Sequence, residues 1–259
     1  MPPTSPRRRS VALVTGAAQG IGSAITNALA ATGHTVAAID RNPRPLTEPT
    51  NRPPLGNIRH FAVDVTDAES VNTTVKEIEH TLGPIEALVN VAGVLHLASA
   101  LDTSDNDWHT TFAVNSTGVF LVSRAVATQM RTRRHGAIVT VSSNAAGIPR
   151  MNMAAYAASK AAATMFTKCL GLELAAYGIR CNVVAPGSTD TPMQRRFRDT
   201  GPQDGALRGD PAVFRTGIPL GRIATPDDVA NAVLFLLSDQ ARHITMHDLY
   251  VDGGATLRA

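Results

Sequence analysis

The chain has 259 residues, of which 44% are hydrophobic and 17% are charged, and its formal net charge is +3. This balance is typical of a folded domain and excludes a largely disordered chain. A nucleic-acid partner would need a coherent basic face with base-stacking aromatics. Because aromatic residues make up only 4%, we expect no nucleic-acid partner. No apolar run approaches 18 residues, so we expect no transmembrane helix, no membrane partner and a cytoplasmic location.

One domain is expected over residues 10–259, because no internal repeat or linker interrupts the chain. Residues 1–9, with three prolines and three arginines, should form a flexible tail ahead of it. The continuous apolar run 11–14 predicts a first strand covered on both faces. A small-residue helix should then run to about Thr32, with Gly33 as its C-cap.

A glycine-rich segment separates this strand from its helix. The spacing of its three glycines differs from the tighter G-x-G-x-x-G fingerprint, but a strand precedes it, a helix follows it and Asp40 stands about 20 residues further on. This order is typical of a dinucleotide site, where glycines let the backbone approach a pyrophosphate at the positive end of a helix. The residues expected to contact the cofactor here are Gly16, Gln19, Gly20, Ile21 and Gly22.

The residue that ends the second strand, 35–39, decides the expected cofactor. The carboxylate of Asp40 can accept hydrogen bonds from both hydroxyls of the adenine ribose, and it would repel a 2′-phosphate. We therefore expect NAD rather than NADP. Arg41 follows immediately and could instead bind that phosphate.

The middle of the chain should continue the alternation of strands and helices. Segment 41–57 contains five prolines, a density that forbids a regular helix, so an irregular crossover is expected. A third strand over 59–63 and a helix over 68–82 should follow. A long helix is predicted over 104–131, and it carries Asn115 on an otherwise apolar face. That asparagine either makes a hydrogen bond between helices or takes part in the site.

Polar and small residues stand where the third and fourth strands end. Asp64 can accept a hydrogen bond from the adenine amino group, and Val65 lies beside it. After the fourth strand, which begins near residue 87, Asn90 can brace the sheet while Ala92 and Gly93 leave room for the cofactor. Because the carboxyl ends of parallel strands form the ligand-binding edge of open α/β sheets, these residues should line one cleft.

A tyrosine and a lysine four residues apart form the centre of the expected site. Tyr156 and Lys160 lie on one face of the helix predicted over 154–177, so the ammonium can favour the ionised form of the phenol. This would make Tyr156 a general base, although a free phenol has a pKa of about 10. Ser143 follows the strand 137–141 and stands 13 positions before the tyrosine.

The C-terminal third completes a predicted single-domain, Rossmann-type, doubly wound sheet with seven parallel strands. A sixth strand is expected over 180–184 and the last over 249–251, with a capped helix over 225–237 between them. Segment 188–220, rich in Thr, Gly, Pro and Arg, should form a lid over the site, with short helical pieces.

The two cysteines, Cys169 and Cys181, have no partner at metal-ligand spacing. Free buried thiols are the simplest interpretation of both. No metal site is expected.

With these motifs the chain resembles a short-chain dehydrogenase/reductase over nearly its whole length. The resemblance implies that Tyr156 is the base and that Lys160 lowers its pKa and holds the nicotinamide ribose. It further implies that Ser143 orients the substrate hydroxyl and that Asn115 supports a water-linked proton path from Lys160. Pro186, Gly187 and Thr189 are then expected to contact the cofactor. Members are typically homotetramers in which the two long helices form one interface.

Three long runs, 136–162, 169–195 and 243–259, are similar to a narrower group within this family. Its members use NAD to oxidise a ring alcohol of a cyclohexadiene carboxylate, which yields the catechol acid of catecholate siderophores. The resemblance therefore implies a small-molecule carboxylate substrate and a role in secondary metabolism.

A carboxylate substrate calls for a cation in the site. Arg150 lies between Ser143 and the catalytic helix, on a loop expected to cross the active-site mouth, although a plain surface arginine is also possible. Met193 and Gln194 in the lid could pack on the substrate ring. If Arg150 does not bind the substrate carboxylate, Arg195 or Arg196 in the lid is the next candidate for that cation.

Three alternatives remain open. The substrate could be trans-2,3-dihydro-3-hydroxyanthranilate, with an amine at C2, or an unrelated ketone that the enzyme reduces. From a different class, the chain could be a dinucleotide sensor without catalytic activity. The presence of Ser143, Tyr156 and Lys160 together argues against the sensor, which would not need all three.

Overall fold

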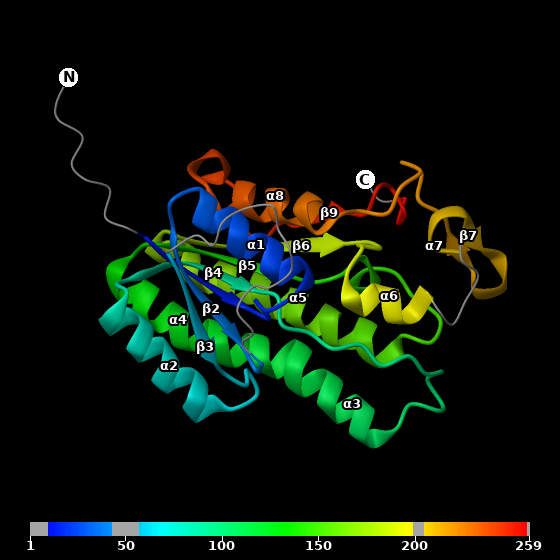
Figure 1. Cartoon of the computed structure of the whole chain (residues 1–259), viewed down its shortest axis with the longest axis horizontal. Helices are drawn as coiled ribbons and strands as arrows, with labels where there is room; N and C mark the ends of the chain where they lie inside the picture. Colours follow the sequence, from blue (N-terminus) through cyan, green and yellow to red (C-terminus); the bar gives the residue numbers. More distant parts are fainter. Residues whose placement is uncertain (1–9, 43–56, 199–204, 258–259) are drawn as a thin grey trace.

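The computed structural model describes residues 10–42, 57–198 and 205–257, and the tail 1–9 and most of the proline-rich crossover lie outside them. A seven-stranded sheet in the order β3-β2-β1-β4-β5-β6-β9 runs through the middle of the molecule (Figure 1). Every neighbouring pair in it is parallel. The predicted doubly wound α/β class and the seven parallel strands are confirmed.

The strands of the large sheet read as near-continuous apolar runs because helices cover both faces. All five residues of the first strand, VALVT, are buried. The strands are β1 (Val11–Thr15), β2 (Thr35–Asp40), β3 (Ile58–Ala62), β4 (Ile85–Asn90), β5 (Gly136–Val141), β6 (Ile179–Pro186) and β9 (Asp248–Val251).

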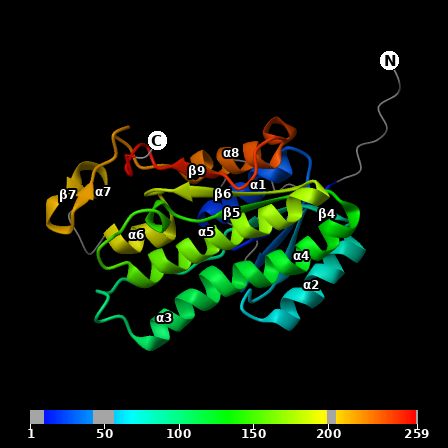
Figure 2. The same cartoon turned by 180° about the vertical axis from the view of Figure 1, so that it is seen from behind.

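Two layers of helices enclose the sheet. On one face lie α1 (Gly20–Ala31) and α8 (Pro226–Leu237), which pack against each other. On the other face lie α2 (Ala68–Thr81), α4 (Val119–Arg133) and α5 (Ala154–Leu174), and Figure 2 shows α4 and α5 side by side. Each layer closes its own hydrophobic core against the sheet.

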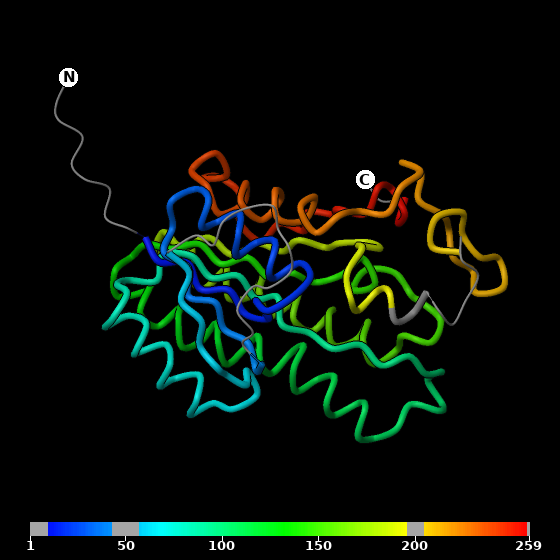
Figure 3. The backbone as a smooth tube through the Cα atoms, viewed as in Figure 1, coloured from blue at the N-terminus to red at the C-terminus, as the bar shows by residue number. Residues whose placement is uncertain are grey.

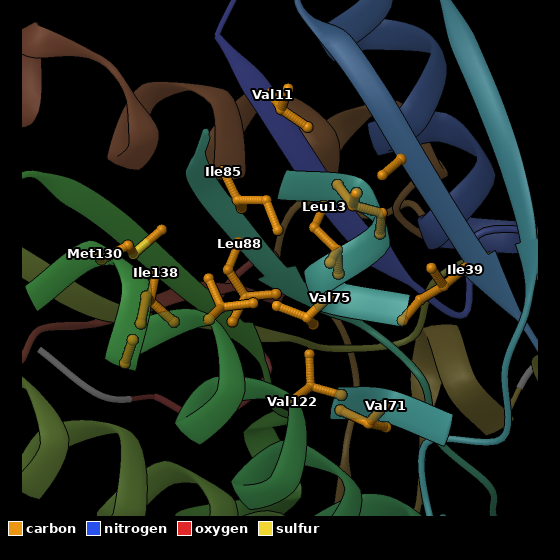
Figure 4. Packing of buried hydrophobic residues seen from close by; sticks show 14 of the residues in the cluster. Val11, Leu13, Ile39, Val71, Val75, Ile85, Leu88, Val122, Met130 and Ile138 are labelled. Atoms are coloured by element: carbon orange, nitrogen blue, oxygen red, sulfur yellow. The ribbon is translucent and has the colours of Figure 1, made fainter. Parts of the chain in front are cut away.

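The core on the α2–α4 side shows how the sheet and helices lock together (Figure 4). Leu88 of β4 and Ile138 of β5 are 0% and 1% exposed, and they belong to one cluster with Val75 of α2 and Val122 of α4. Full burial of side chains of this kind contributes about 1.5–3 kcal/mol each. This packing fixes the strand ends from which the site is built.

The helix predicted over 104–131 is interrupted in the structure. It begins as α3 (Asp105–Phe112), widens into a π-helical segment, η1 (Ala113–Gly118), and resumes as α4. The predicted long helix is therefore present in extent, but its regular α-helical geometry changes to a π turn in the middle. Single π turns inside α-helices occur frequently at functional sites, and this one contains Asn115.

The described part of the lid contains the expected short helices, α6 (Pro192–Arg198) and α7 (Gly205–Arg208). It also contains an antiparallel strand pair, β7 (Gly209–Asp210) and β8 (Arg215–Thr216), which the sequence did not predict. The tube in Figure 3 follows the chain from β6 out into this segment and back to α8.

Three smaller predictions need correction. The catalytic helix α5 ends at Leu174, and the predicted last turn is a 3₁₀ helix at Ala175–Tyr177. The C-cap of α1 is Thr32, and Gly33 follows it with a φ of +93°. Cys169 is exposed, whereas Cys181 is buried as expected.

Candidate active site

Two cavities open beyond the carboxyl ends of the strands. One, of about 290 Å³, lies over the glycine-rich turn after β1, and we name it the cofactor cleft. The other, of about 310 Å³, lies between the end of β5, the start of α5 and the lid, and we name it the substrate cavity. Ile21, Thr191 and Met193 line both, so the two cavities adjoin, as a hydride transfer between two bound molecules requires.

The glycine turn gives the cofactor cleft its floor. Gly16 has a φ of +64°, and a Cβ built on it would lie 2.8 Å from the backbone of Ala92 after β4, so only glycine fits. The N-cap of α1 is Gln19, whose side chain makes no capping hydrogen bond. The first N–H groups of this helix thus remain available for an anion, which is how a pyrophosphate is held.

The predicted adenine-side residues meet in this cleft. Asp40, Arg41, Asp64 and Val65 all line it. The Asp40 carboxylate is oriented by the N–H groups of Ala18 and Asn42, at 3.1 and 3.0 Å. The pKa of Asp64 is lowered, chiefly because the N–H and hydroxyl of Thr66 donate to it and further because the charge of Arg41 is near.

Asn90 is the predicted cofactor residue whose side chain does not reach the cleft. It is 2% exposed, and its amide donates to Ser123 of α4 at 2.9 Å and to Thr140 of β5 at 3.4 Å. Its predicted role in bracing the sheet is therefore confirmed, whereas its predicted contact with the cofactor stays a prediction, since Asn90 is not among the residues that line the cleft. Gly93 lines the cleft together with Ala92.

Tyr156 and Ser143 line the substrate cavity, and Lys160 lies behind the tyrosine, 5% exposed. The Ser143 hydroxyl is near enough to the Tyr156 side chain to lower the pKa of the phenol. The Lys160 ammonium lies 5.9 Å from the centre of the tyrosine ring and donates to the Val141 carbonyl at 2.9 Å. The sequence-predicted triad is thus brought together.

The pKa values in this triad differ from the simple expectation. Burial raises the pKa of Tyr156, and the hydrogen bond from Ser143 only partly opposes it. Burial lowers the pKa of Lys160 from 10.5 to about 8. The expected lowering of the tyrosine pKa is therefore wrong for the protein alone, because burial is the largest influence on the phenol and raises its pKa.

Asn115 makes the hydrogen bond between helices that one of its two interpretations requires. Its amide donates to Ser159 of α5 at 3.0 Å, which is the hydrogen bond between helices. The same side chain accepts from the Val94 N–H at 2.8 Å and donates to the Val94 carbonyl at 2.9 Å. It is 0% exposed, so it acts by fixing the segment after Gly93 against the catalytic helix. A Cβ on Gly93 would lie 3.3 Å from the Asn115 amide oxygen and 3.4 Å from Lys160 Nζ.

The predicted substrate residues Arg150, Met193 and Gln194 line the substrate cavity. Pro186, Gly187 and Thr189, predicted to contact the cofactor, also line this cavity rather than the cleft. Arg195 does not line it, is 62% exposed and pairs with Asp190 at 3.0 Å. The side chain of Arg196 lies outside the described residues.

Sequence analysis missed several residues of the substrate cavity. A second arginine, Arg215 of β8, lines it, and the buried acid Asp252, just after β9, lies against the lining residue Gly187. Leu95, Leu97 and Met151 add apolar surface. Nothing in the sequence separates Arg215 from the other arginines of the lid, because its position depends on the unpredicted strand pair.

The described residues contain no group of three or more histidine, cysteine, aspartate or glutamate side chains that could hold a metal ion. Within the same residues, no helix is long and apolar enough to cross a membrane.

Comparison with known proteins agrees with this geometry. Residues 16–256 match the family model described as Enoyl-(Acyl carrier protein) reductase. The 2,3-dihydro-2,3-dihydroxybenzoate dehydrogenase of Bacillus subtilis (strain 168) is 54% identical over 251 residues, which cover 95% of this chain and 96% of the relative. The enzyme of that name from Escherichia coli (strain K12) is 44% identical, with coverage of 95% and 96%. A crystal structure of gox2181 is similar with a TM-score of 0.88 and 32% identity, covering 96% of both chains.

The fold, the two adjoining cavities and these matches define a dehydrogenase that uses a nicotinamide dinucleotide. The chain belongs to the short-chain dehydrogenase/reductase family.

Burial of Lys160 predicts an unusual effect on stability. Its folded-state pKa of about 8 lies below the unfolded value of 10.5. Below pH 8 the lysine is charged in both states, so burial of the charge lowers the free energy of unfolding of wild type by its full amount. As the pH rises from 8 to 10.5 this destabilisation disappears, because the folded state has already released the proton. Lys160→Met should therefore be more stable at pH 7 by as much as about 3 kcal/mol, although it removes the bond to Val141. Its advantage should shrink between pH 8 and 10.5.

Denaturant unfolding at several pH values measures this. The matched control is Lys76→Met on the exposed face of α2, which should change stability by no more than about 0.5 kcal/mol at any pH. A Lys160→Met variant that is less stable at both pH 7 and pH 10 would show that the buried ammonium is not a burden on the fold.

Proposed function

We propose that this chain is an NAD-dependent dehydrogenase that oxidises the C3 alcohol of 2,3-dihydro-2,3-dihydroxybenzoate to give 2,3-dihydroxybenzoate. The observation that carries the proposal is 54% identity, over nearly the whole of both chains, to a relative named for this reaction. The substrate cavity supports it, because Ser143, Tyr156 and Arg150 line one space that suits a ring carrying both an alcohol and a carboxylate.

The proposed mechanism assigns each side chain a step. Ser143 orients the C3 hydroxyl, and Tyr156 as the phenolate takes the hydroxyl proton while the C3 hydrogen leaves as hydride. The nicotinamide supplies the hydride acceptor when bound. Lys160 favours the phenolate by its charge, and Asn115 keeps the segment after Gly93 in place. The resulting dienone tautomerises to an aromatic ring, which makes the overall direction favourable.

Two other substrates suit the same chemistry, namely the C2 amine trans-2,3-dihydro-3-hydroxyanthranilate and a ketone that would be reduced. The three relatives of 43–54% identity named for dihydroxybenzoate formation favour the C2 hydroxyl. Mixing the purified protein with NAD and each substrate, and following NADH formation and the aromatic product, separates these readings. Turnover of neither acid would contradict the proposal, and turnover of no alcohol at all would favour the sensor.

We further propose that the protein is a homotetramer whose α4 and α5 helices form one interface. Phe120, Met165 and Leu172, on these two helices, are 38%, 59% and 69% exposed. Apolar side chains gathered on adjacent helices are typical of surfaces that meet a partner. Leu172→Glu should therefore reduce a particle of four chains to a smaller one in light scattering. A wild type that scatters as a monomer would contradict the assembly.

Tyr156→Phe keeps the ring and removes the proton acceptor. The value of kcat should fall by about 10²–10⁴, the usual range for general acid–base catalysis, while NAD still binds. Because burial raises the pKa of Tyr156, wild-type kcat/KM should increase with pH above neutrality, and the variant should lose that increase. A variant that retains more than about a tenth of wild-type kcat would rule out Tyr156 as the base.

NAD should be preferred to NADP by about tenfold or more in kcat/KM, because Asp40 can accept two charge-assisted hydrogen bonds from the ribose. The charge of Arg41 already interacts with the Asp64 carboxylate, so Arg41 is less available to bind a 2′-phosphate. Asp40→Ala should shrink the preference. Asp40→Asn is the matched control that removes the charge but keeps the shape, and it should give an intermediate preference. Equal use of both cofactors by wild type would contradict this assignment.

Arg150→Ala should raise KM for the dihydro-dihydroxybenzoate by roughly 30-fold or more, since a half-buried carboxylate left without its cation costs about 2–5 kcal/mol. An uncharged cyclic alcohol should be turned over almost as before. Arg195→Ala, outside the cavity, should change neither. Equal losses on both substrates would mean that Arg150 shapes the loop instead.

A further inference from the structure

The substrate cavity contains two arginines from separate parts of the chain. Arg150 lies on the loop between β5 and α5, and Arg215 belongs to β8 in the lid. Both side chains are partly buried and both line the cavity. Guanidinium groups are rarely buried without partners, because each presents five N–H donors that must exchange water for an acceptor.

These donors are largely unused within the described residues. Arg215 donates to the hydroxyl of Ser188, at 2.7 Å, and Arg150 donates to no described residue. Neither guanidinium forms an ion pair with a described carboxylate. The cavity therefore presents two cations whose donors face a space rather than the protein.

The carboxylate of Asp210 also lines the cavity, and Asp252 lies against the lining residue Gly187, but backbone N–H groups already hold both carboxylates. Asp252 accepts from the N–H groups of Gly254 and Thr256, both at 3.0 Å. Asp210 accepts from the Ala212 N–H at 3.0 Å. Their charges stabilise Arg150 and Arg215 respectively from beyond ion-pair distance. They thus hold the cations in place without filling their donors.

The two arginines also act on each other. After burial, the charge of Arg215 is the largest cause that lowers the pKa of Arg150. Two like charges that line one partly buried cavity repel each other, and an anion placed between them removes the repulsion and satisfies donors of both.

We infer that Arg150 and Arg215 together form a carboxylate-binding site for the ring substrate, which makes Arg215 a specificity-determining residue. The inference rests on the proposed function and extends it, since that function assigns only Arg150. It holds equally for a C2 hydroxyl or a C2 amine, because both substrates carry the carboxylate. An acid bound in this way links the body of the enzyme, through Arg150, to the lid, through Arg215.

Binding of 2,3-dihydroxybenzoate and of catechol to the NADH complex, measured by calorimetry, tests this inference. The two ligands differ only in the carboxylate. Arg215→Gln should weaken binding of the acid by about tenfold or more and leave catechol within about twofold. Arg215→Lys keeps the charge but not the two-pronged geometry, so it should recover part of the loss. Arg195→Gln, an exposed lid arginine outside the cavity, is the matched control and should behave as wild type.

Each other outcome overturns the assignment of Arg215. Equal weakening of both ligands would mean that Arg215 holds the lid through Ser188, and Ser188→Ala should then reproduce the effect. Unchanged binding of the acid would leave Arg150 as its sole cation. A wild type that binds catechol as tightly as the acid would show that no carboxylate site exists.

These results are separable from a failure of the proposed function. A wild type that prefers the acid over catechol and loses that preference in Arg215→Gln, yet does not oxidise the dihydro-dihydroxybenzoate, would overturn the reaction and leave the carboxylate site in place. If the protein oxidises that substrate and the kinetics do not change in Arg215→Gln, the proposed reaction stands and the role of Arg215 in binding the carboxylate is overturned.

Discussion

The active site depends on one buried ammonium. Lys160 is 5% exposed and donates a hydrogen bond to the carbonyl of Val141, at the end of β5. Burying a cation with so little compensation is costly, and burial lowers its pKa to about 8. Gly93 leaves space beside the ammonium, and Asn115 fixes the segment that follows. The packed sheet holds this arrangement. The stability that the core contributes therefore offsets the cost of holding a buried cation near the Tyr156 phenol.

The remaining elements bring two reactants to that pair. The turn after β1 and the ends of β2 and β4 form the cofactor cleft, while the β5–α5 loop and the lid form the substrate cavity, and both share Ile21, Thr191 and Met193. Parallel topology places these strand ends at one edge. The lid contributes Arg215, which lines the substrate cavity and lies outside the seven-stranded sheet.

Much of this could be predicted from the sequence, because local patterns determine it. The apolar runs and the glycine turn followed by Asp40 predicted the observed sheet, and the Tyr156–Lys160 spacing predicted two side chains that the structure places near each other. The π turn around Asn115 and the β7–β8 pair depend on tertiary packing, and so does the place of Arg215. The direction of the Tyr156 pKa was wrong because spacing along a helix shows which charges are near but not how deeply they are buried. The sequence predicted that Asn90 braces the sheet but not its partners, Ser123 and Thr140, because they come from α4 and β5.

The most direct test is a titration of Lys160 itself by NMR, with lysine labelled at the ε-carbon. The chain has only three lysines, so the signals can be assigned with Lys160→Met, while Lys76 and Lys168 remain as internal references. The account predicts a midpoint near pH 8 for Lys160 in the protein alone. A midpoint near 10.5, the ordinary value for a lysine side chain, would contradict the claim that the site is built around a buried and weakly compensated cation.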